Sequence, residues 1–542
     1  MRFFVTLLII ASFCCSNIVA EAAPQGGKGV KRGALATAPE CVTLPAQSIK
    51  SHNVSIKVAS EPVEVSLSDA WFGVVGSVSA LEARKLQDIA IWAEPNFSTA
   101  ERRGEVVITG KKSGKIQRIT IAQPPYLTQI KEAFPARLST KRYTGDKWVS
   151  DGICSPNKNG SMLSVVSTNG GNIVCENNHG AMLSGLDVGD YLLYAVPVKN
   201  LEAGEQIDFM CTIAANDENS PKYWIFEYWD NGRWNAVESD LRVAEEDPAI
   251  KYSFYIKRFA SSHYTSYAQS FILNTPIAEG VVKVRLRVLS KGSGRVRIPD
   301  ARGYVGMWMI RYKNAPAVAD TNKFLIVGNS FTYFYGTPFM FKEIARSEGH
   351  QVDVVVSVKG GQEFSEHLQL ERTLEAIGRG GFDYAILQDT SPNPAIYADK
   401  GLEYIYTSSR EINDLTYKYS PNCKIVYERT WACPHNNYRT YGSYERLEYL
   451  LDKGSQMLAE QLGDVVVSPI GHGFKIAREH NINLLSSDNR HQNSAGAYMK
   501  ACINYLFIYK TRFSDKVSNC GIESNLAKQI RAIAEQVVLE KE

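Results

Sequence analysis

The pattern of apolar and polar positions divides the chain into three regions. From residue 41 to 123, short stretches alternate apolar with polar side chains and are separated by turn residues, which predicts β-strands with one buried face. The predicted strands cover 54–58, 63–65, 89–92, 106–108 and 119–121. Pro124 and Pro125 end the series, because proline terminates strands. Residues 40–125 are therefore predicted to form a small all-β sandwich.

The second region, residues 126–318, is also predicted to be rich in strands. Residues 282–288 alternate apolar and basic side chains, as a strand with one solvated face does. Asn231-Gly232 lies within an aromatic stretch and is a strong hairpin signal. We predict a second β-sandwich of the jelly-roll type. The rings of Trp229 and Trp234 are candidates for stacking on a sugar, and packing inside the protein is the open alternative.

The third region, residues 319–542, changes to short apolar runs that alternate with helical patterns. Such runs predict parallel strands buried on both faces, and the helices between them predict a three-layer, doubly wound α/β domain. The predicted strands cover 324–327, 354–356, 384–387, 424–427 and 465–467, and the predicted helices cover 338–347, 402–419, 444–462 and 494–509. In such a sheet, catalytic and ligand-binding residues lie in the loops at the carboxyl ends of the strands.

The amino terminus has the features of a secretory signal. Arg2 precedes an apolar stretch over 3–13, and Ala20-Glu21-Ala22 offers small residues for cleavage. We expect a signal peptide over 1–22 and a flexible linker over 23–39. The apolar stretch is too short to cross a bilayer of about 30 Å. The expected protein is exported to a periplasm or the cell surface and has no transmembrane segment after cleavage.

The cysteines leave two interpretations open. Cys14 and Cys15 belong to the predicted signal peptide, and the other eight of the ten show no metal-ligand spacing. In an oxidising compartment, Cys154 with Cys175 and Cys423 with Cys433 are local candidates for disulfides, and free buried thiols are the alternative.

Composition excludes some functions. The chain of 542 residues carries 60 basic and 57 acidic side chains, and its net charge of +3 comes without a dense basic run, so no nucleic-acid partner is expected. No pair of histidines has the helical spacing with an intervening glutamate that zinc hydrolases use. We expect neither a metal nor an organic cofactor, and the oligomeric state is left open.

Two short motifs carry the chemistry. Gly328-Asn329-Ser330 ends the first strand of the third region, where the glycine permits a sharp turn and a serine stands at a helix N-terminus that favours developing negative charge. A serine needs a base and a carboxylate that orients it. Asp488 and His491 lie in one loop before the last predicted helix, so the three side chains predict a nucleophile, a base and an orienting acid.

At these residues the third region resembles the SGNH hydrolases, also called GDSL esterases, whose sheet begins with Gly-Asp-Ser and ends with Asp-x-x-His. It is particularly similar to a branch with Gly-Asn-Ser-Phe at the start and an early Gly-Gly loop, here Lys359-Gly360-Gly361-Gln362. The resemblance implies an oxyanion hole made by the N–H groups of Ser330 and Gly361 and by a side-chain amide. The broad family supplies that amide from asparagine, whereas Gln388 stands at this place in the chain.

Four further residues are candidates for binding the substrate, and structural roles are the open alternative for them. They are Asn329, His367, Trp431 and His435.

The first region resembles the BACON domain, an immunoglobulin-like module of exported proteins that handle glycans. The resemblance rests on Trp71, Asn96-Phe97-Ser98, Arg103-Gly104 and the closing stretch 119–123. It implies an immunoglobulin-like sandwich that acts as a spacer or binds carbohydrate.

These features predict an exported serine esterase that removes acyl groups, above all O-acetyl groups, from a polysaccharide or glycan through an acyl-enzyme. The glycan substrate class is inferred by association, from the expected export and from the two β-rich regions. The alternatives are a glycan-binding protein with an inactive hydrolase domain, a lipid or aryl esterase, and an acyltransferase that uses the same acyl-enzyme.

Overall fold

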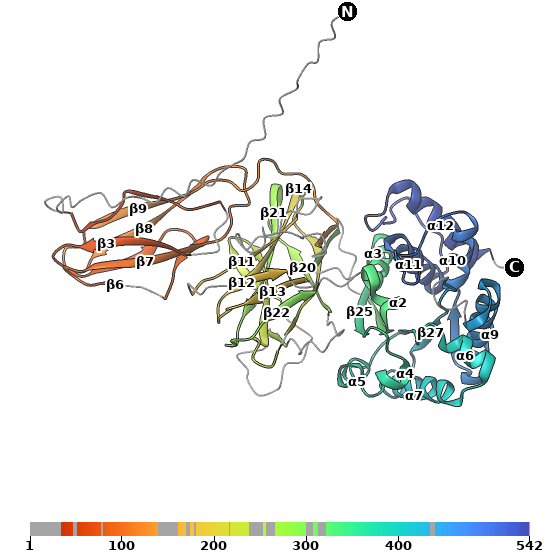
Figure 1. Ribbon diagram of the computed structural model, residues 1–542. Coiled ribbons are helices and arrows are strands. Elements are labelled where there is room, and N and C mark those ends of the chain that lie inside the picture. Colours follow the sequence, from red (N-terminus) through yellow and green to blue (C-terminus); the bar gives the residue numbers. More distant parts are fainter. Residues whose placement is uncertain are drawn as a thin grey trace, which may run out of the picture.

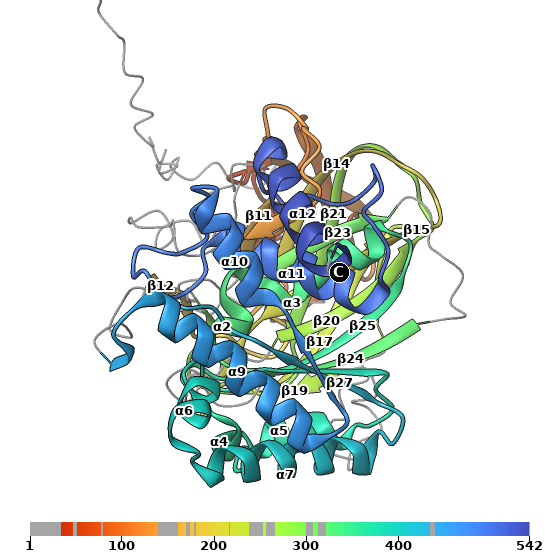
Figure 2. The ribbon, with the colours of Figure 1, turned by 90° about the vertical axis from the view of Figure 1, so that its right-hand side faces the viewer.

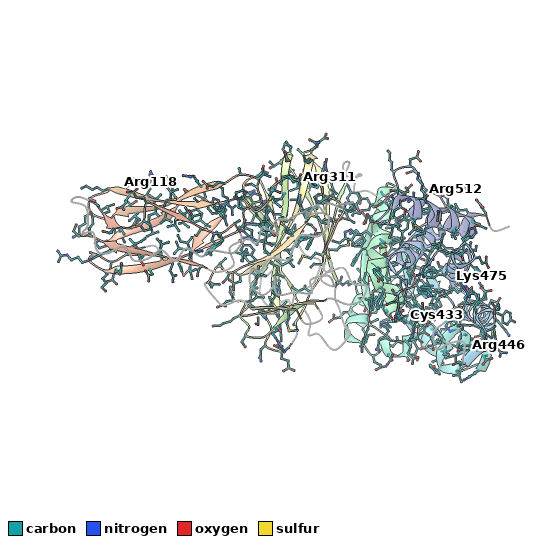
Figure 3. All side chains as sticks on the ribbon, turned by 45° about the horizontal axis from the view of Figure 1, so that its top comes forward. Arg118, Arg311, Cys433, Arg446, Lys475 and Arg512 are labelled. Atoms are coloured by element: carbon teal, nitrogen blue, oxygen red, sulfur yellow. The ribbon has the colours of Figure 1, made fainter. Side chains whose placement is uncertain are left out.

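The computed structural model forms three units that follow one another in space as they do in sequence (Figure 1). Figure 3 marks Arg118 on the first unit, Arg311 on the second and Arg512 on the third. The predicted signal peptide and the linker up to residue 33 lie outside the described residues. The structure describes residues 34–46, 51–76, 80–138, 161–169, 174–177, 180–215, 217–237, 253–255, 266–299, 307–312, 321–433 and 440–540.

The first unit consists of two sheets that share one core. One sheet has the strand order β1–β3–β7–β5, and the other has the order β2–β9–β8–β4–β6. Alternate residues of β8 are buried, and Ile108 is fully enclosed with Ile56 and Ile89. The predicted strands of this region are confirmed, and the immunoglobulin-like assignment stays a prediction. The strands are β1 (Ala36–Thr37), β2 (Cys41–Thr43), β3 (His52–Val58), β4 (Val63–Leu67), β5 (Phe72–Val74), β6 (Ala80–Leu81), β7 (Leu86–Ala93), β8 (Arg102–Gly110) and β9 (Ile116–Gln123).

The second unit is built from two larger sheets and one smaller sheet. The larger sheets have the orders β11–β14–β21–β17–β18, with β19 beside β17, and β10–β23–β15–β20, and the smaller is β12–β13–β22–β16. The two larger sheets contribute to one apolar core. The strands are β10 (Ala136–Leu138), β11 (Met162–Val166), β12 (Val174–Asn177), β13 (Gly180–Ser184), β14 (Tyr191–Leu201), β15 (Glu205–Thr212), β16 (Ala214–Ala215), β17 (Tyr223–Asp230), β18 (Arg233–Ala236), β19 (Ser253–Tyr255), β20 (Ser266–Leu273), β21 (Ile277–Val288), β22 (Val296–Pro299) and β23 (Met307–Tyr312).

The predicted aromatic hairpin is present. Asp230 pairs with Arg233 across a turn in which Asn231 and Gly232 both have positive φ, as a tight hairpin requires. Cations of β21 already cover the two half-buried indole rings of the hairpin, since Lys283 Nζ lies 4.4 Å from the Trp229 ring centroid and the Arg285 guanidinium lies 4.3 Å from that of Trp234. These indole faces are therefore engaged by the protein itself.

Buried contacts join the first unit to the second. Glu94 is 2% exposed, accepts a hydrogen bond of 2.9 Å from the Tyr191 hydroxyl and forms an ion pair of 3.0 Å with Lys283. Phe97 packs with Met162 of the second unit in a small apolar cluster.

The second unit contacts the third through helix α3 (Thr337–Ser347). Asp208 is fully buried and pairs with Lys342 at 3.4 Å and Arg346 at 3.1 Å. Trp308 packs edge-on against Phe339 beside these charges. The third unit is thus fixed against the middle sandwich by both charge and apolar contact.

The third unit contains a five-stranded parallel sheet of order β25–β24–β26–β27–β28. Phe324 and Ile326 point into the core on one face, while Leu325 and Val327 are buried in the core on the other. This two-sided burial is the reason for the continuous apolar runs. The strands are β24 (Thr321–Gly328), β25 (Gln351–Val358), β26 (Tyr384–Leu387), β27 (Lys424–Glu428) and β28 (Val465–Ser468).

Helices cover both faces of this sheet and confirm the predicted α/β class. Figure 2 shows α10, α11 and α12 on one side of the strands and α4, α5 and α7 on the other. Among the described residues, no helix is long and apolar enough to cross a membrane. Besides α3, the described α-helices of this unit are α2 (Ser330–Tyr333), α4 (Phe364–His367), α5 (Glu371–Gly378), α6 (Asn393–Lys400), α7 (Glu403–Tyr419), α9 (Tyr444–Leu462), α10 (Ile470–Glu479), α11 (Ser494–Tyr509) and α12 (Ser524–Leu539).

One candidate disulfide is wrong. Cys423 precedes β27 and Cys433 lies five residues beyond its end. Both side chains are buried, and because the extended strand separates them, no disulfide joins them. Cys154, the partner suggested for Cys175, lies outside the described residues.

Candidate active site

The serine motif forms a sharp strand-to-helix turn. Strand β24 ends at Gly328, and the one-turn helix α2 (Ser330–Tyr333) starts two residues later. Asn329 caps this helix, because its Oδ1 accepts the Phe331 N–H at 3.1 Å. Ser330 is the first residue of the helix, so its own N–H has no intrahelical acceptor. A Cβ at Gly328 would lie 2.2 Å from Thr332 Oγ1, which explains the glycine.

The histidine loop holds its own carboxylate in place. Oδ1 of Asp488 accepts the backbone N–H groups of Arg490 and His491, both at 3.0 Å. This leaves Oδ2, which lies 2.6 Å from Nδ1 of the His491 ring. The three-residue spacing therefore places a carboxylate and an imidazole in contact within a single turn.

The serine and the histidine loop meet at the carboxyl edge of the sheet. Ser330 Oγ lies 2.8 Å from His491 Nε2, although 161 positions separate them. A carboxylate oxygen only accepts, so His491 Nδ1 carries the hydrogen that is donated to Asp488, and Nε2 is free to accept the hydroxyl hydrogen of Ser330. The three side chains thus form one directed chain of hydrogen bonds, the arrangement that general-base activation of a serine requires.

The local bonds keep the acid of this chain ionised. Partial burial raises the pKa of Asp488, but the hydrogen bonds from the His491 ring and from the backbone of Arg490 and His491 outweigh it, so the pKa lies below its ordinary value. At neutral pH, Asp488 is therefore a carboxylate that balances an imidazolium charge.

Aromatic side chains fix the ring of His491 and its loop. Phe334 stacks on the imidazole with centroids 4.4 Å apart, and Phe331 lies 5.2 Å from it. Trp431 donates its indole N–H to the Arg490 carbonyl at 3.1 Å and stacks on Phe474 at 4.0 Å. Trp431 is 2% exposed, so the structure places it behind the histidine loop.

Gly361 lies on the loop after β25 that was expected to supply an oxyanion donor. Its φ of +74° is left-handed, which favours glycine, and a Cβ at this position would meet no atom within 4 Å. The requirement for glycine is therefore conformational. The nearby Lys359 N–H donates to the Gly328 carbonyl at 3.0 Å, which holds this loop against the serine turn.

Gln388 follows β26 and is buried beside the serine turn. Its Oε1 accepts the Thr332 hydroxyl at 2.8 Å and the Asn329 N–H at 3.3 Å, and its Nε2 donates to the Asp389 carbonyl. The side chain therefore braces the serine turn. An amide nitrogen carries two hydrogens, so the second hydrogen is compatible with the expected oxyanion role.

Besides Trp431, two further candidate substrate-binding residues lie inside the protein. Asn329 is 2% exposed, and its Nδ2 donates to the carbonyls of Gln362 and Asp389 at 3.0 and 3.2 Å. His367 is 0% exposed, with Nε2 bonded to the Gly328 carbonyl and Nδ1 to the Thr373 hydroxyl, both at 3.1 Å. Both side chains support the serine turn from behind. His435 lies outside the described residues.

A second carboxylate stands close to the loop of Gly361. Burial raises the pKa of Asp389 to about 6, against hydrogen bonds from Asn393 and from the N–H groups of Phe364 and Thr390 that lower it. Because Phe364 begins the helix after the glycine loop, Asp389 ties that loop to the end of β26.

Sequence reasoning missed three residues that complete this arrangement. They are Phe334, Gln492 and Lys500, of which the latter two bond the Phe331 carbonyl. Phe334 stands in an aromatic run just after the serine, which was a usable signal, whereas the others have partners more than 150 positions away.

Other features of the third unit stand apart from these residues. A cleft of about 500 Å³ lies between α9 and α10, lined by Arg429, Tyr449, His472 and Lys475 among others and by none of Ser330, Asp488 and His491. Figure 3 shows Lys475 on the side of the unit away from the second unit. Within the described residues, no group of three or more His, Cys, Asp or Glu side chains is arranged to hold a metal ion.

Comparisons with known proteins give remote structural likenesses. No family model matches the chain, and no curated protein matches it. A crystal structure of a DUF4886 family protein from Bacteroides uniformis shares 19% identity over 41% of this chain and 95% of its own, with a TM-score of 0.36.

Two further solved structures are similar at the same level. A protein from Slackia heliotrinireducens proposed to be an SGNH hydrolase shares 20% identity over 35% of this chain and 100% of its own, with a TM-score of 0.30. A family two carbohydrate esterase from Cellvibrio japonicus shares 12% identity over 69% of this chain and 99% of its own, with a TM-score of 0.27.

Proposed function

We propose that the protein is an exported serine esterase that removes acyl groups, above all O-acetyl groups, from a polysaccharide or glycan. The observation that carries the esterase part is the directed hydrogen-bond chain from Ser330 through His491 to Asp488. The serine stands at a helix N-terminus, which favours the developing oxyanion, and the ionised carboxylate orients the imidazole that takes the serine proton.

The proposed reaction proceeds in two halves. Ser330 Oγ attacks the ester carbonyl carbon while His491 Nε2 takes the hydroxyl proton, and the resulting oxyanion is stabilised by the N–H groups of Ser330 and Gly361 and by the Gln388 amide. His491 then gives the proton to the leaving alkoxide, which breaks the ester bond and leaves an acyl group on Ser330. Water, deprotonated by His491, attacks the carbonyl carbon of this acyl-enzyme. His491 then returns the proton to Ser330 Oγ as the bond between Oγ and the acyl carbon breaks, which releases the carboxylic acid and restores the serine. Asp488 orients the imidazole and balances its charge throughout.

The glycan substrate is proposed from the first region and from export. The first region resembles modules of exported proteins that handle glycans, and export itself is an expectation from the first 22 residues. The middle sandwich is fixed to the third unit through Asp208, which keeps the β-rich region attached to the unit that contains Ser330. An aryl or lipid ester is the competing substrate.

The function is tested with the full mature chain on a small activated acetyl ester and on acetylated polysaccharides. Acetate release from both, abolished by Ser330→Ala, supports the whole proposal. Hydrolysis of the small ester alone supports the chemistry and refutes the glycan part. Activity on neither substrate contradicts the esterase and favours a glycan-binding protein, which a glycan pull-down then examines.

A further inference from the structure

The serine turn is too short to satisfy its own carbonyl groups. Helix α2 has four residues, and Tyr335 adopts a left-handed conformation with φ 59°, so the chain leaves the helical path after one turn. In a continued helix, the Phe331 carbonyl would accept the N–H of residue 335. Here it accepts two side-chain donors, Lys500 Nζ at 2.8 Å and Gln492 Nε2 at 2.9 Å.

Both donors come from the segment that carries the histidine. Gln492 directly follows His491, and Lys500 lies two turns further along, in α11. Gln492 is 0% and Lys500 is 1% exposed, so water does not compete for these bonds. The carbonyl next to Ser330 is therefore bonded by the neighbour of His491, which ties the two halves of the hydrogen-bond chain together.

The charge of Lys500 is balanced inside the protein. Its Nζ lies 2.6 Å from Oε2 of Glu428, the last residue of β27, and the two side chains are 1% and 2% exposed. Glu428 also accepts from Asn504 Nδ2 at 2.7 Å, and Asn504 Oδ1 accepts the hydroxyl of Ser468, at the end of β28, at 2.9 Å. The network anchors Lys500 to the carboxyl ends of two strands.

A buried ion pair is a costly way to fill this volume. Two charges lose their hydration, and an apolar pair of similar size is often as stable or more stable. An apolar pair would not provide the charge-assisted hydrogen bond that Lys500 donates to the Phe331 carbonyl.

We propose that Lys500 is a positioning residue for Ser330, which holds the serine turn at hydrogen-bond distance from His491 through the Phe331 carbonyl while Glu428 holds Lys500. The inference rests on the proposed esterase function and adds to it a residue that touches neither the substrate nor the reacting atoms. Lys500 affects only the position of the serine hydroxyl relative to His491. Its replacement therefore changes kcat and leaves KM nearly unchanged.

The test compares two variants of the full chain, Lys500→Met and the pair Glu428→Met with Lys500→Met. The measurements are kcat and KM on a small activated acetyl ester, the rate at which a fluorophosphonate labels Ser330, and the midpoint of thermal unfolding. We expect Lys500→Met to lower kcat and the labelling rate about 10- to 100-fold, with KM within about twofold. The double variant regains the thermal midpoint, because no charge is left unpaired, but it does not regain kcat.

A matched control separates positioning from general damage. Lys342 is equally buried in an ion pair, with Asp208, and faces the second unit. Lys342→Met is expected to lower the thermal midpoint and to leave kcat within about twofold. Wild-type kcat in the double variant would overturn the inference, and so would an equal loss of kcat in Lys342→Met. If Lys500→Met does not fold, the double variant decides alone. Activity that survives Ser330→Ala refutes the esterase mechanism instead.

Discussion

The aromatic ring of Phe334 lies flat on the imidazole of His491, with centroids 4.4 Å apart and planes inclined by 21°. The stacked ring covers one face of the imidazole and so restricts its rotation. An aromatic pair of this kind contributes about 0.5–1.5 kcal/mol.

Replacing this ring is expected to loosen the base without removing it. Phe334→Leu should lower kcat about 2- to 10-fold, because the imidazole then spends less time aligned with Ser330. Steady-state kinetics on a small activated ester checks this. Tyr449→Ala serves as the control, since Tyr449 is 62% exposed on α9. An unchanged kcat in Phe334→Leu would show that the other contacts of the loop suffice.

The carboxylate of Asp488 determines which ring nitrogen of His491 carries hydrogen. Asp488→Asn presents an amide that can donate to Nδ1, so the hydrogen moves to Nε2, where it can no longer accept the serine proton. We expect kcat to fall by about 10³- to 10⁴-fold near pH 7 with the protein still folded. Circular dichroism checks the fold, and a loss below tenfold would contradict the assigned tautomer.

The stabilising effect of Asp488 has a defined dependence on pH. The pKa of Asp488 in the folded state lies below the ordinary value of this carboxyl group. The ionised carboxylate therefore contributes fully to the free energy of unfolding above about pH 4, and this contribution is lost as the pH falls through the lower, folded-state pKa. The difference in thermal midpoint between wild type and Asp488→Asn should therefore shrink below about pH 4.

The sequence was most informative where the chemistry lies within one loop or at the end of one strand. Asp488 and His491 are three positions apart, and Ser330 follows an apolar run. Local sequence patterns were therefore enough to identify all three as candidate catalytic residues. The strands and helices of the third unit followed from two-sided burial, as in 324–327.

Contacts between distant parts of the chain could not be predicted from local sequence patterns. Lys500 lies in a helix most of whose residues are buried, and no sequence pattern predicts that it bonds the Phe331 carbonyl. His367 is a candidate substrate-binding residue by sequence, but in the structure its side chain is buried and bonds the Gly328 carbonyl. Pairing of this kind depends on the three-dimensional packing of segments more than 30 positions apart.

The conformation of Gly361 gives a sharp test of the oxyanion loop. Gly361→Ala meets open space but forces a side chain into a left-handed conformation, at a cost of about 1–2 kcal/mol. If the loop relaxes, its N–H moves away from the oxyanion, and kcat should fall at least about tenfold.

A second glycine provides the matched control. Gly463 also has positive φ, 83°, and open space for a Cβ, but it caps α9 just before β28, at the opposite end of the sheet. Gly463→Ala should lower the thermal midpoint similarly and leave kcat unchanged. Equal kcat values in the two variants would remove Gly361 from the proposed oxyanion hole.

Asp389 makes the stability of the third unit sensitive to pH in the opposite direction to Asp488. Its folded-state pKa of about 6 lies above the unfolded value of about 3.9, so the folded state retains a proton that the unfolded state has lost, and stability falls as the pH rises from about 4 to 6. Asp389→Asn should remove this fall, worth about 1–3 kcal/mol. Unfolding midpoints of both proteins across pH 4 to 7.5 check it, and parallel curves would contradict the raised pKa.

The most direct test of the account is the reaction of Ser330 itself. The wild-type chain and Ser330→Ala are incubated with a small activated acetyl ester, and the acetyl-enzyme is sought by mass spectrometry of the intact protein and its peptides. The account predicts an added acetyl group on the peptide that contains Ser330 and at least about a 10³-fold loss of hydrolysis in the variant. Hydrolysis that survives in Ser330→Ala, or an acetyl group on another residue in the active wild type, would contradict it.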